Sequence, residues 1–292
     1  MLLLVVAVGF LAHRYLLRKQ PVATYPGTVS QDTADRTIAS IPQFEIYPKE
    51  DKLHRPPLPD LIKPTPGASP RVAIIVDDLG YNRRIARKFL DLDAVLTYSV
   101  LPHTPHTKSI AREIQAKGQE IMLHLPMEPL EYPRINPGPG TLLTSMSPDE
   151  LVTQLKKNLA AVPGIKGVNN HMGSKMTAES SQVYQIFTIL KQHDLFFVDS
   201  RSTAATVCRP SARLFQLPFA ERDVFIDHVQ SPEFIRKQLR TLIRIATKSG
   251  QAVGIVHPSK SSLTVLQEML PEIERKSNWC RPLNLSTWPV DG

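Results

Sequence analysis

Several apolar runs in this chain end in residues that can bind a metal ion or move a proton. The runs and the residues that end them are Val72–Val76 before Asp77 and Asp78, Ile121–Leu123 before His124, Val168 before the turn that holds His171, Leu195–Val198 before Asp199, and Val253–Val256 before His257. In α/β barrels the apolar strands are buried and their carboxyl ends carry the chemistry. Two carboxylates and three histidines that meet at such an end suggest a metal hydrolase.

The adjacent carboxylates of Asp77 and Asp78 are the strongest single feature of the sequence. Two neighbouring negative charges at a strand end repel each other unless a positive charge lies beside them, and a divalent cation supplies it. The other interpretation is a helix cap followed by a solvated acid. The five apolar residues in front of the pair favour the cation site.

The histidines at two other strand ends extend this interpretation. A lone histidine such as His124 or His171 is more often structural than a ligand. Together with Asp78 at an equivalent topological position, however, the two complete a set of one carboxylate and two imidazoles. Such a set leaves coordination positions open for water and substrate, which is typical of a catalytic metal site.

Further polar residues at strand ends could support the site. Asp199 and Arg201 could orient neighbouring catalytic groups or could simply pair with each other. Asp227 and His228 could add a polar layer or could form the entry to the next helix. His257 is a candidate proton donor, because an unliganded histidine near a metal can protonate a leaving group close to neutral pH.

The elements that must position these groups alternate between strand and helix about seven times. The expected strands are Val72–Val76, Val95–Leu101, Glu120–His124, Gly167–His171, Leu195–Asp199, Val224–Asp227 and Ala252–His257. This alternation predicts parallel strands joined by crossover helices. A doubly wound open sheet would also fit. The turn after the first strand, Asp77–Gly80, is not a glycine-rich phosphate loop, which weakens a nucleotide-binding interpretation.

The connection after the third strand is expected to be long and irregular. Pro126 should end the strand that carries His124, and the loop should run to Met146. The next helix has a clear start signal, with Ser147 as N-cap, Pro148 in the first turn and Glu150 completing a capping box.

The composition is that of a globular protein with a buried core. The chain has 292 residues, 42% hydrophobic and 21% charged, and a formal charge of +8. No basic run with interleaved aromatic residues is present, so nucleic acid is not an expected partner. Cys208 and Cys280 form no CxxC pair; they could form one disulfide or remain free thiols.

The amino-terminal part differs in composition from the rest. Residues 1–19 form a hydrophobic segment that we interpret as a membrane anchor or signal segment. Residues 20–70 hold ten of the 26 prolines of the chain and predict a proline-rich linker. Residues 71–292 are the expected catalytic domain. These features predict a protein of the cell envelope, anchored in the inner membrane or periplasmic.

The strand-end motifs, taken in order, resemble the divergent polysaccharide deacetylase family. The matching segments are Ile75–Gly80, His124–Pro129, Gly167–Ser174, Phe197–Arg201, Val224–His228 and Gly254–Pro258. The resemblance implies a distorted (β/α)7 barrel and a metal-dependent deacetylase site. It also implies roles: Asp77 as catalytic base, Asp78, His124 and His171 as metal ligands, His257 as general acid, and Asp199 and Arg201 as supporting residues.

The expected activity is removal of N-acetyl groups from an envelope or amino-sugar polysaccharide, with a divalent metal, zinc by expectation, as cofactor. In better-known deacetylases the two metal histidines share one segment, whereas here they lie on different predicted strands. The alternative is a deacetylase-fold protein with little or no activity that acts as an envelope binding or scaffold protein. A metal phosphoesterase fits less well, because it would need more acidic ligands.

Overall fold

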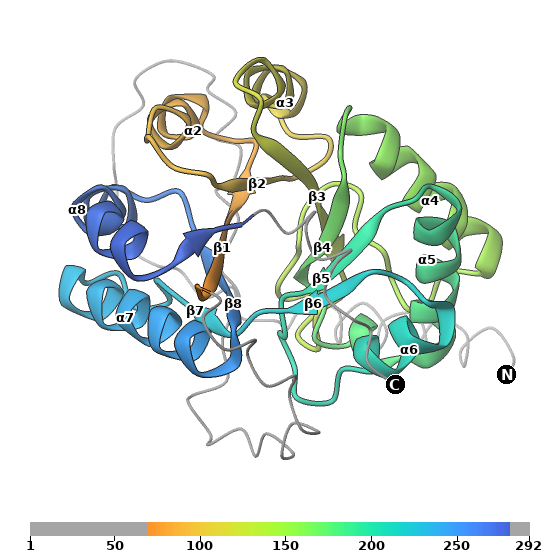
Figure 1. The fold of residues 1–292 in the computed structure, drawn as a ribbon. Helices are drawn as coiled ribbons and strands as arrows, with labels where there is room; N and C mark the ends of the chain where they lie inside the picture. Colours follow the sequence, from red (N-terminus) through yellow and green to blue (C-terminus); the bar gives the residue numbers. More distant parts are fainter. Residues whose placement is uncertain (1–68, 281–292) are drawn as a thin grey trace, which may run out of the picture. The chain divides into compact units, whose positions relative to one another are not determined.

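The computed structural model describes residues 69–280, which form one parallel sheet with helices packed around it (Figure 1). Eight strands follow one another in the order β6-β5-β4-β3-β2-β1-β8-β7, and β9 pairs with β1. The strands are β1 (Arg71–Leu79), β2 (Thr97–Val100), β3 (Glu120–Met127), β4 (Gly167–Met172), β5 (Phe196–Asp199), β6 (Phe219–Glu221), β7 (Val224–Phe225), β8 (Gln251–Val256) and β9 (Asn278–Trp279).

The two end strands of the sheet are consecutive in the chain, and this connection closes the barrel. β6 pairs with β5, and β7 pairs with β8. Between them, the backbone N–H of Arg222 donates to the carbonyl of Asp199, and that of Asp223 donates to the carbonyl of Val253. One continuous segment therefore changes partner from β5 to β8. Counted as one bent strand, it makes the fold a distorted (β/α)7 barrel, which confirms the predicted class.

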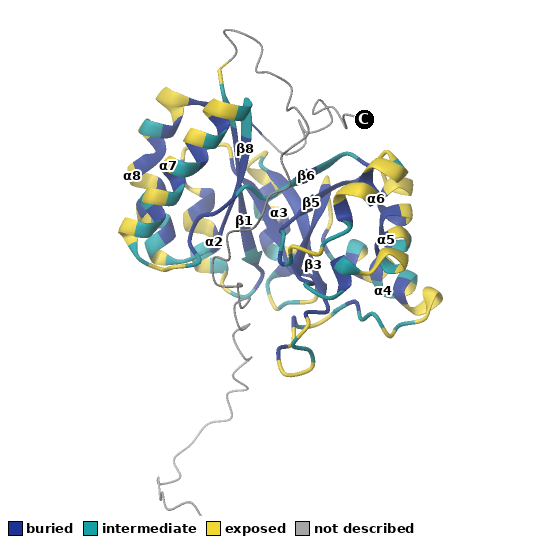
Figure 2. Ribbon diagram, turned by 90° about the horizontal axis from the view of Figure 1, so that it is seen from below, coloured by how far each residue is buried: buried dark blue, intermediate teal, exposed yellow. Residues whose placement is uncertain are grey.

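Helices follow most of the strands and cover the outside of the barrel. They are α2 (Arg83–Leu90), α3 (Thr107–Ala116), α4 (Pro148–Ala161), α5 (Ser180–Gln192), α6 (Cys208–Phe215), α7 (Pro232–Ser249) and α8 (Lys260–Lys276), with a short 3-10 turn, η1 (Met176–Ala178), after β4. Figure 2 shows buried strands at the centre and exposed outer faces on the helices. The predicted capping box is confirmed: Ser147 caps α4 and Glu150 returns the bond.

The alternation of side chains along the strands separates two apolar layers. In β1, Val72, Ile74 and Val76 pack in the large cluster beneath the helices, whereas Ala73 and Ile75 belong to a smaller cluster on the other face of the sheet, inside the barrel. Because the side-chain period of a strand is two, the residue two positions after an interior side chain also faces the interior. This rule decides which strand-end residues reach the site.

The carboxyl end of β3 differs from the prediction. Pro126 was expected to end the strand, but β3 continues to Met127, with Pro126 in register with His171 of β4. The β2 ladder has already stopped at the pair of Val100 and Leu123. Pro126 therefore lies where β3 has no β2 partner on that side, the kind of position in which a proline is tolerated within a strand.

Other elements were not predicted, namely α6, β6 and β9. They are short, and α6 carries a proline in its first turn, so periodicity gives little signal. Cys208 and Cys280 are buried free thiols. Within residues 69–280, no helix has the length and apolar composition needed to cross a bilayer. The predicted anchor and almost all of the predicted linker lie outside the described residues.

Candidate metal centre

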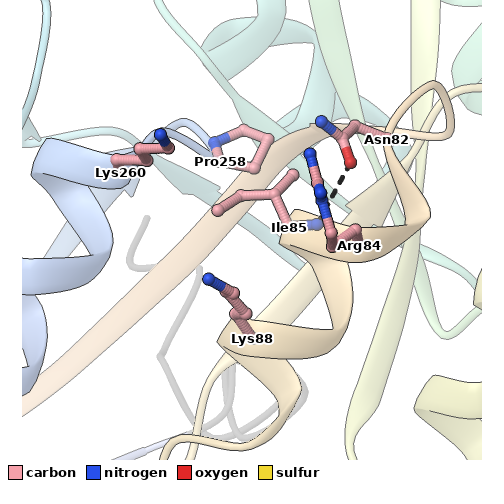
Figure 3. A pocket seen from close by; sticks show the side chains of 6 residues that line it. All are labelled: Asn82, Arg84, Ile85, Lys88, Pro258 and Lys260. Carbon is pink, nitrogen blue, oxygen red and sulfur yellow. Dashed lines mark hydrogen bonds between the residues drawn. The ribbon is translucent and has the colours of Figure 1, made fainter.

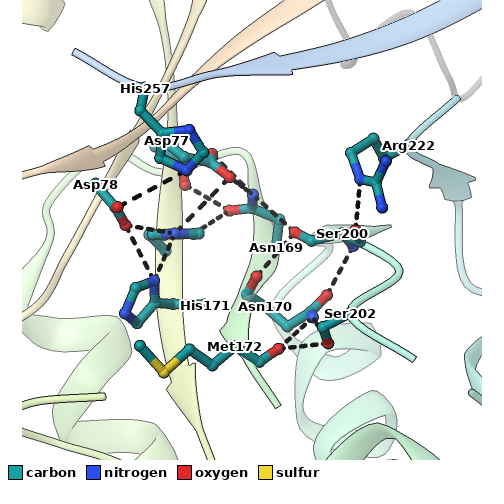
Figure 4. Close-up of polar contacts among 12 residues, drawn as sticks. Asp77, Asp78, Asn169, Asn170, His171, Met172, Ser200, Ser202, Arg222 and His257 are labelled. Carbon is teal, nitrogen blue, oxygen red and sulfur yellow. Dashed lines mark hydrogen bonds and ion pairs between the residues drawn. The ribbon is translucent and has the colours of Figure 1, made fainter. Parts of the chain in front are cut away.

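Asp78, His124 and His171 come together at the carboxyl ends of β1, β3 and β4. Figure 4 shows Asp78 and His171 facing each other, with Asp77 and His257 beside them. The Oδ1 atom of Asp78 lies 3.1 Å from Nε2 of His124 and 3.0 Å from Nδ1 of His171. The two imidazole nitrogens are 3.1 Å apart. Ligand atoms held about 2.0–2.2 Å from one tetrahedral zinc ion are roughly 3.3 Å from one another, so the triangle has the size of a metal site.

The backbone of Asp78 explains how two consecutive carboxylates face one site. Asp77 follows Ala73 and Ile75 on the interior face, so Asp78 in a regular strand would point outward. Asp78 instead has φ 55°, and the pairing of β1 with β2 changes register between Val76 and Leu79. The left-handed conformation is strained for an aspartate, and such strain is commonly retained at functional sites.

Asn169 determines which ring nitrogen of a neutral His124 carries the hydrogen. The Nδ2 atom of Asn169 donates to both carboxylate oxygens of Asp77, at 2.9 and 3.0 Å. This sets the orientation of the amide, so its Oδ1 atom must accept, and the partner 3.0 Å away is Nδ1 of His124. A neutral His124 then carries its hydrogen on Nδ1 and presents the bare lone pair of Nε2 to the other two ligands.

The carboxylate oxygen of the candidate metal set is buried without a hydrogen-bond donor among residues 69–280. This atom, Oδ1 of Asp78, lies within 3.1 Å of both imidazole nitrogens, but neither contact has acceptable hydrogen-bond geometry. Burial would raise the pKa of Asp78, but His171, His124 and His257 hold it well below its ordinary value. Asp78 is therefore an ionised carboxylate facing two imidazole nitrogens, a donor set suited to a divalent metal.

Asp77 lies beside this set without being one of its three members. Its Oδ2 atom is 3.7 Å from Nε2 of His124. Burial raises the pKa of Asp77, although His124, His257 and the amide of Asn169 act in the opposite direction. A carboxylate with a raised pKa is a stronger base than an exposed one, so Asp77 is placed and tuned to accept a proton.

His257 reaches the site from β8, following the interior residues Val253 and Ile255 on alternate positions. Its Nδ1 atom lies 2.9 Å from Oδ1 of Asp227, and its Nε2 atom lies 3.8 Å from Oδ2 of Asp78. Burial would lower the pKa of His257, but Asp227, together with Asp78 and Asp77, raises it to about 10. The imidazole is therefore protonated near neutral pH, with Nε2 directed toward the centre.

Asp227 is held by several donors besides His257. The backbone N–H of His257 and the hydroxyl of Ser262 both donate to its Oδ2 atom, at 2.8 and 2.6 Å. Ser262 belongs to the first turn of α8, where Ser259 is the N-cap. The beginning of α8 thus fixes the carboxylate that orients His257.

Asp199 and Arg201 contact each other and residues of the loop after β5 and of β6. Asp199 alternates with the interior residue Val198, and its carboxylate accepts from the backbone N–H of Arg201 and from the hydroxyl of Thr206, both at 2.7 Å. The guanidinium of Arg201 pairs with Glu221 at 3.0 Å. The two residues thus organise the loop after β5, and their supporting role in catalysis stays a prediction.

Asn169, Ser262 and Asp227 contribute more to the site than the sequence indicated. Asn169 lies two positions before His171 on the same face of β4, and this spacing could have identified it. For Asp227 the sequence left open a polar layer of the site or the entry to the next helix, and the structure shows that it contacts His257 directly. Ser262 gave no sequence signal, because serine in a helical first turn is common.

Comparisons with known proteins identify a family and several relatives of this chain. A family model described as divergent polysaccharide deacetylase matches residues 74–281. The uncharacterized protein YibQ of Escherichia coli K12 is 32% identical over 206 residues, which are 70% of this chain and 64% of that protein. The chain therefore spans just under two thirds of this curated relative.

Two further relatives extend the comparison. An uncharacterized protein of Haemophilus influenzae is 28% identical over 200 residues, 68% of this chain and 71% of that protein. The crystal structure of an uncharacterized protein from Agrobacterium tumefaciens C58 superposes with a TM-score of 0.69 at 27% identity, covering 73% of this chain and 87% of the other.

Proposed function

Because the chain belongs to the divergent polysaccharide deacetylase family, we propose that it is a metal-dependent hydrolase that removes N-acetyl groups from an envelope or amino-sugar polysaccharide. The observation that carries the proposal is the convergence of Asp78, His124 and His171, with donor atoms 3.0–3.1 Å apart. A buried acid, Asp77, and a protonated histidine, His257, flank this set. A purely structural zinc site would use four protein ligands, whereas this one has three and two proton-transfer groups.

We assign Asp78, His124 and His171 to hold the metal, for which zinc is our proposal. A divalent cation bound there would polarise the amide carbonyl and make water a stronger nucleophile. Imidazole and carboxylate ligands suit zinc and also other first-row metals. Elemental analysis of the purified protein identifies which ion it retains.

The residues of the chain supply the proton transfers. Asp77 accepts the proton of the attacking water, and Asn169 holds its carboxylate in place through two hydrogen bonds. His257 then donates the proton on Nε2 to the leaving amine, while Asp227 holds the opposite nitrogen of the ring. Burial raises the pKa of Asp77, which makes its carboxylate a stronger base. The carboxylates of Asp227, Asp78 and Asp77 raise the pKa of His257, which keeps the ring protonated until it donates.

The place of action is part of the proposal. The composition of residues 1–70 supports a hydrophobic anchor or signal segment followed by a proline-rich linker. Such a segment would place the barrel in the cell envelope, at the inner membrane or in the periplasm, where acetylated amino-sugar polymers occur. Fractionation of cells that express the full chain, with and without residues 1–19, tests this location.

Metal content and acetate release test the function together. We expect wild-type protein to hold close to one divalent ion, and Asp78→Ala and His171→Ala to lose it. His257→Gln should retain the ion but release acetate from peptidoglycan or chitin fragments at least a hundredfold more slowly. Wild-type protein that holds no divalent metal after growth in metal-replete medium would overturn the scheme. Metal-loaded protein that releases no acetate from any such polymer would favour the scaffold alternative.

A further inference from the structure

A groove of about 300 Å³ lies between the beginnings of α2 and α8 (Figure 3). It is lined by Asn82, Arg84, Ile85, Lys88, Pro258 and Lys260. Half of these side chains are cationic and none is acidic. The groove is therefore a positively charged recess, and the proposed hydrolysis does not account for it.

The basic residues of α2 separate into two faces. Arg83 and Arg87 both pair with Glu113 of α3. Arg84 and Lys88, one turn apart, line the groove instead. Within residues 69–280, neither of them forms an ion pair, and Lys260 forms none either. Like charges one turn apart on a helix repel each other, and an anion bound beside both side chains would relieve this repulsion.

The groove adjoins the reaction centre through the chain itself. Pro258 directly follows His257, the candidate acid, and Asn82 follows Asp78 by only four residues. Consecutive Cα atoms are about 3.8 Å apart, so the Cα atom of Pro258, in the wall of the groove, lies that close to the Cα atom of His257. A polymer whose acetylated sugar occupies the centre can thus extend over the groove with a neighbouring unit.

We propose that this groove binds an anionic group, a carboxylate or a phosphate, carried by the same polysaccharide, so that the substrate is a negatively charged amino-sugar polymer. The proposal rests on the proposed function, whose reaction centre the groove adjoins. Lysine and arginine side chains attract such groups at long range and form charge-assisted hydrogen bonds at contact. A neutral polymer such as chitin would gain nothing from the three cations.

The test compares binding by the full, metal-loaded chain to four polymers. They are glycan strands of peptidoglycan, whose lactyl groups carry carboxylates, the same strands after reduction of the carboxylates to alcohols, a phosphate-bearing wall polymer, and a neutral chitin oligomer. The variant is Arg84→Gln with Lys88→Gln and Lys260→Gln. The control, Arg112→Gln with Lys156→Gln and Lys157→Gln, removes the same charge from the exposed surfaces of α3 and α4.

We expect the groove variant to bind one of the charged polymers at least tenfold more weakly, and the control to bind it as wild type does. Loss of binding after carboxylate reduction identifies a carboxylate, whereas retention on the phosphate polymer identifies a phosphate. Equal binding of both variants to every charged polymer overturns the inference. Binding is measured separately from acetate release. An affinity that depends on the groove residues, without any acetate release, would contradict the proposed function but support anion binding in the groove.

Discussion

At the residue scale, the arrangement depends on one amide. Asn169 contacts Asp77 through its nitrogen and His124 through its oxygen, so a single side chain orients the candidate base and one candidate ligand. The hydroxyl of Ser99 also donates to the oxygen of Asn169. A residue that binds no metal itself therefore decides which nitrogen of His124 is free to bind one.

We predict that Asn169→Ala lowers the metal affinity of the protein about 10–100-fold, because His124 loses the acceptor that holds its Nδ1 hydrogen. Competition with a chromophoric chelator measures the affinity. Asn158→Ala is the matched control, since Asn158 is equally buried and hydrogen-bonded but lies on α4, away from the site. If both variants keep the wild-type affinity, the orienting role of Asn169 is wrong.

A second residue-scale prediction concerns Glu128, just beyond β3. Burial would raise its pKa, but Lys175 and Thr144 outweigh burial and lower it from 4.5. Because the pKa is lower in the folded state, this group stabilises the fold above pH 4.5, and the contribution is lost as the pH falls through the folded pKa. Glu128→Gln should therefore lose less stability than wild type between pH 6 and pH 3.

Urea unfolding at several pH values measures this difference. Glu150→Gln serves as a comparison, because Glu150 also has a lowered pKa but lies in an exposed capping box, where solvent screening weakens the effect. A Glu128→Gln profile that is parallel to the wild-type profile throughout the acid range would contradict the prediction.

At the element scale, strand periodicity determines which predicted residues reach the site. Asp77, His124, His171 and His257 each fall on an interior position of a strand or directly after one, whereas Asp199 alternates with interior Val198. The sequence predicted the strands and their polar ends because apolar runs mark buried strands. It could not predict the left-handed backbone of Asp78 or the orientation of Asn169, because both depend on contacts between strands far apart in the chain.

The beginning of α8 links helix capping to the orientation of His257. Ser259 caps the helix by accepting from the N–H of Ser262, and Ser262 donates to Asp227. We predict that Ser259→Ala costs about 1 kcal/mol of stability, as loss of an N-cap usually does. Thermal unfolding measures the cost, and Ser261→Ala, in the same turn, should leave the melting temperature nearly unchanged. Equal melting temperatures for the two variants would show that the cap contributes nothing.

At the scale of the whole molecule, the barrel is closed by a segment that belongs to two sheet edges. Residues 219–221 pair with β5, and residues 224–225 pair with β8. The sequence predicted one strand here but not its change of partner, since the apolar run is short and interrupted by Arg222 and Asp223. The guanidinium of Arg222 donates to the carbonyls of Ser200 and Arg201, which fastens the segment to the loop after β5.

Asp223 fastens the same segment to the opposite edge. Its backbone N–H donates to the carbonyl of Val253, and its Oδ2 atom accepts from the N–H of Val253 at 2.9 Å. Val253 is fully buried, so Asp223→Ala would leave its N–H without that acceptor. An unsatisfied buried donor costs about 1–3 kcal/mol, and we predict a loss of stability in that range.

The loss should be local before it is global, because β7 has only two residues in its ladder with β8. Hydrogen exchange should therefore rise first in residues 219–226 and in β8, while the amides of β3 and β4 stay protected. Asp223→Asn keeps an acceptor oxygen in place and should restore most of the protection. Uniform loss of protection across all strands in Asp223→Ala would mean that the closing segment does not open separately from the rest of the barrel. The two halves of the candidate site, His257 on β8 and His124 with His171 on β3 and β4, would then be held together by the barrel as a single cooperative unit.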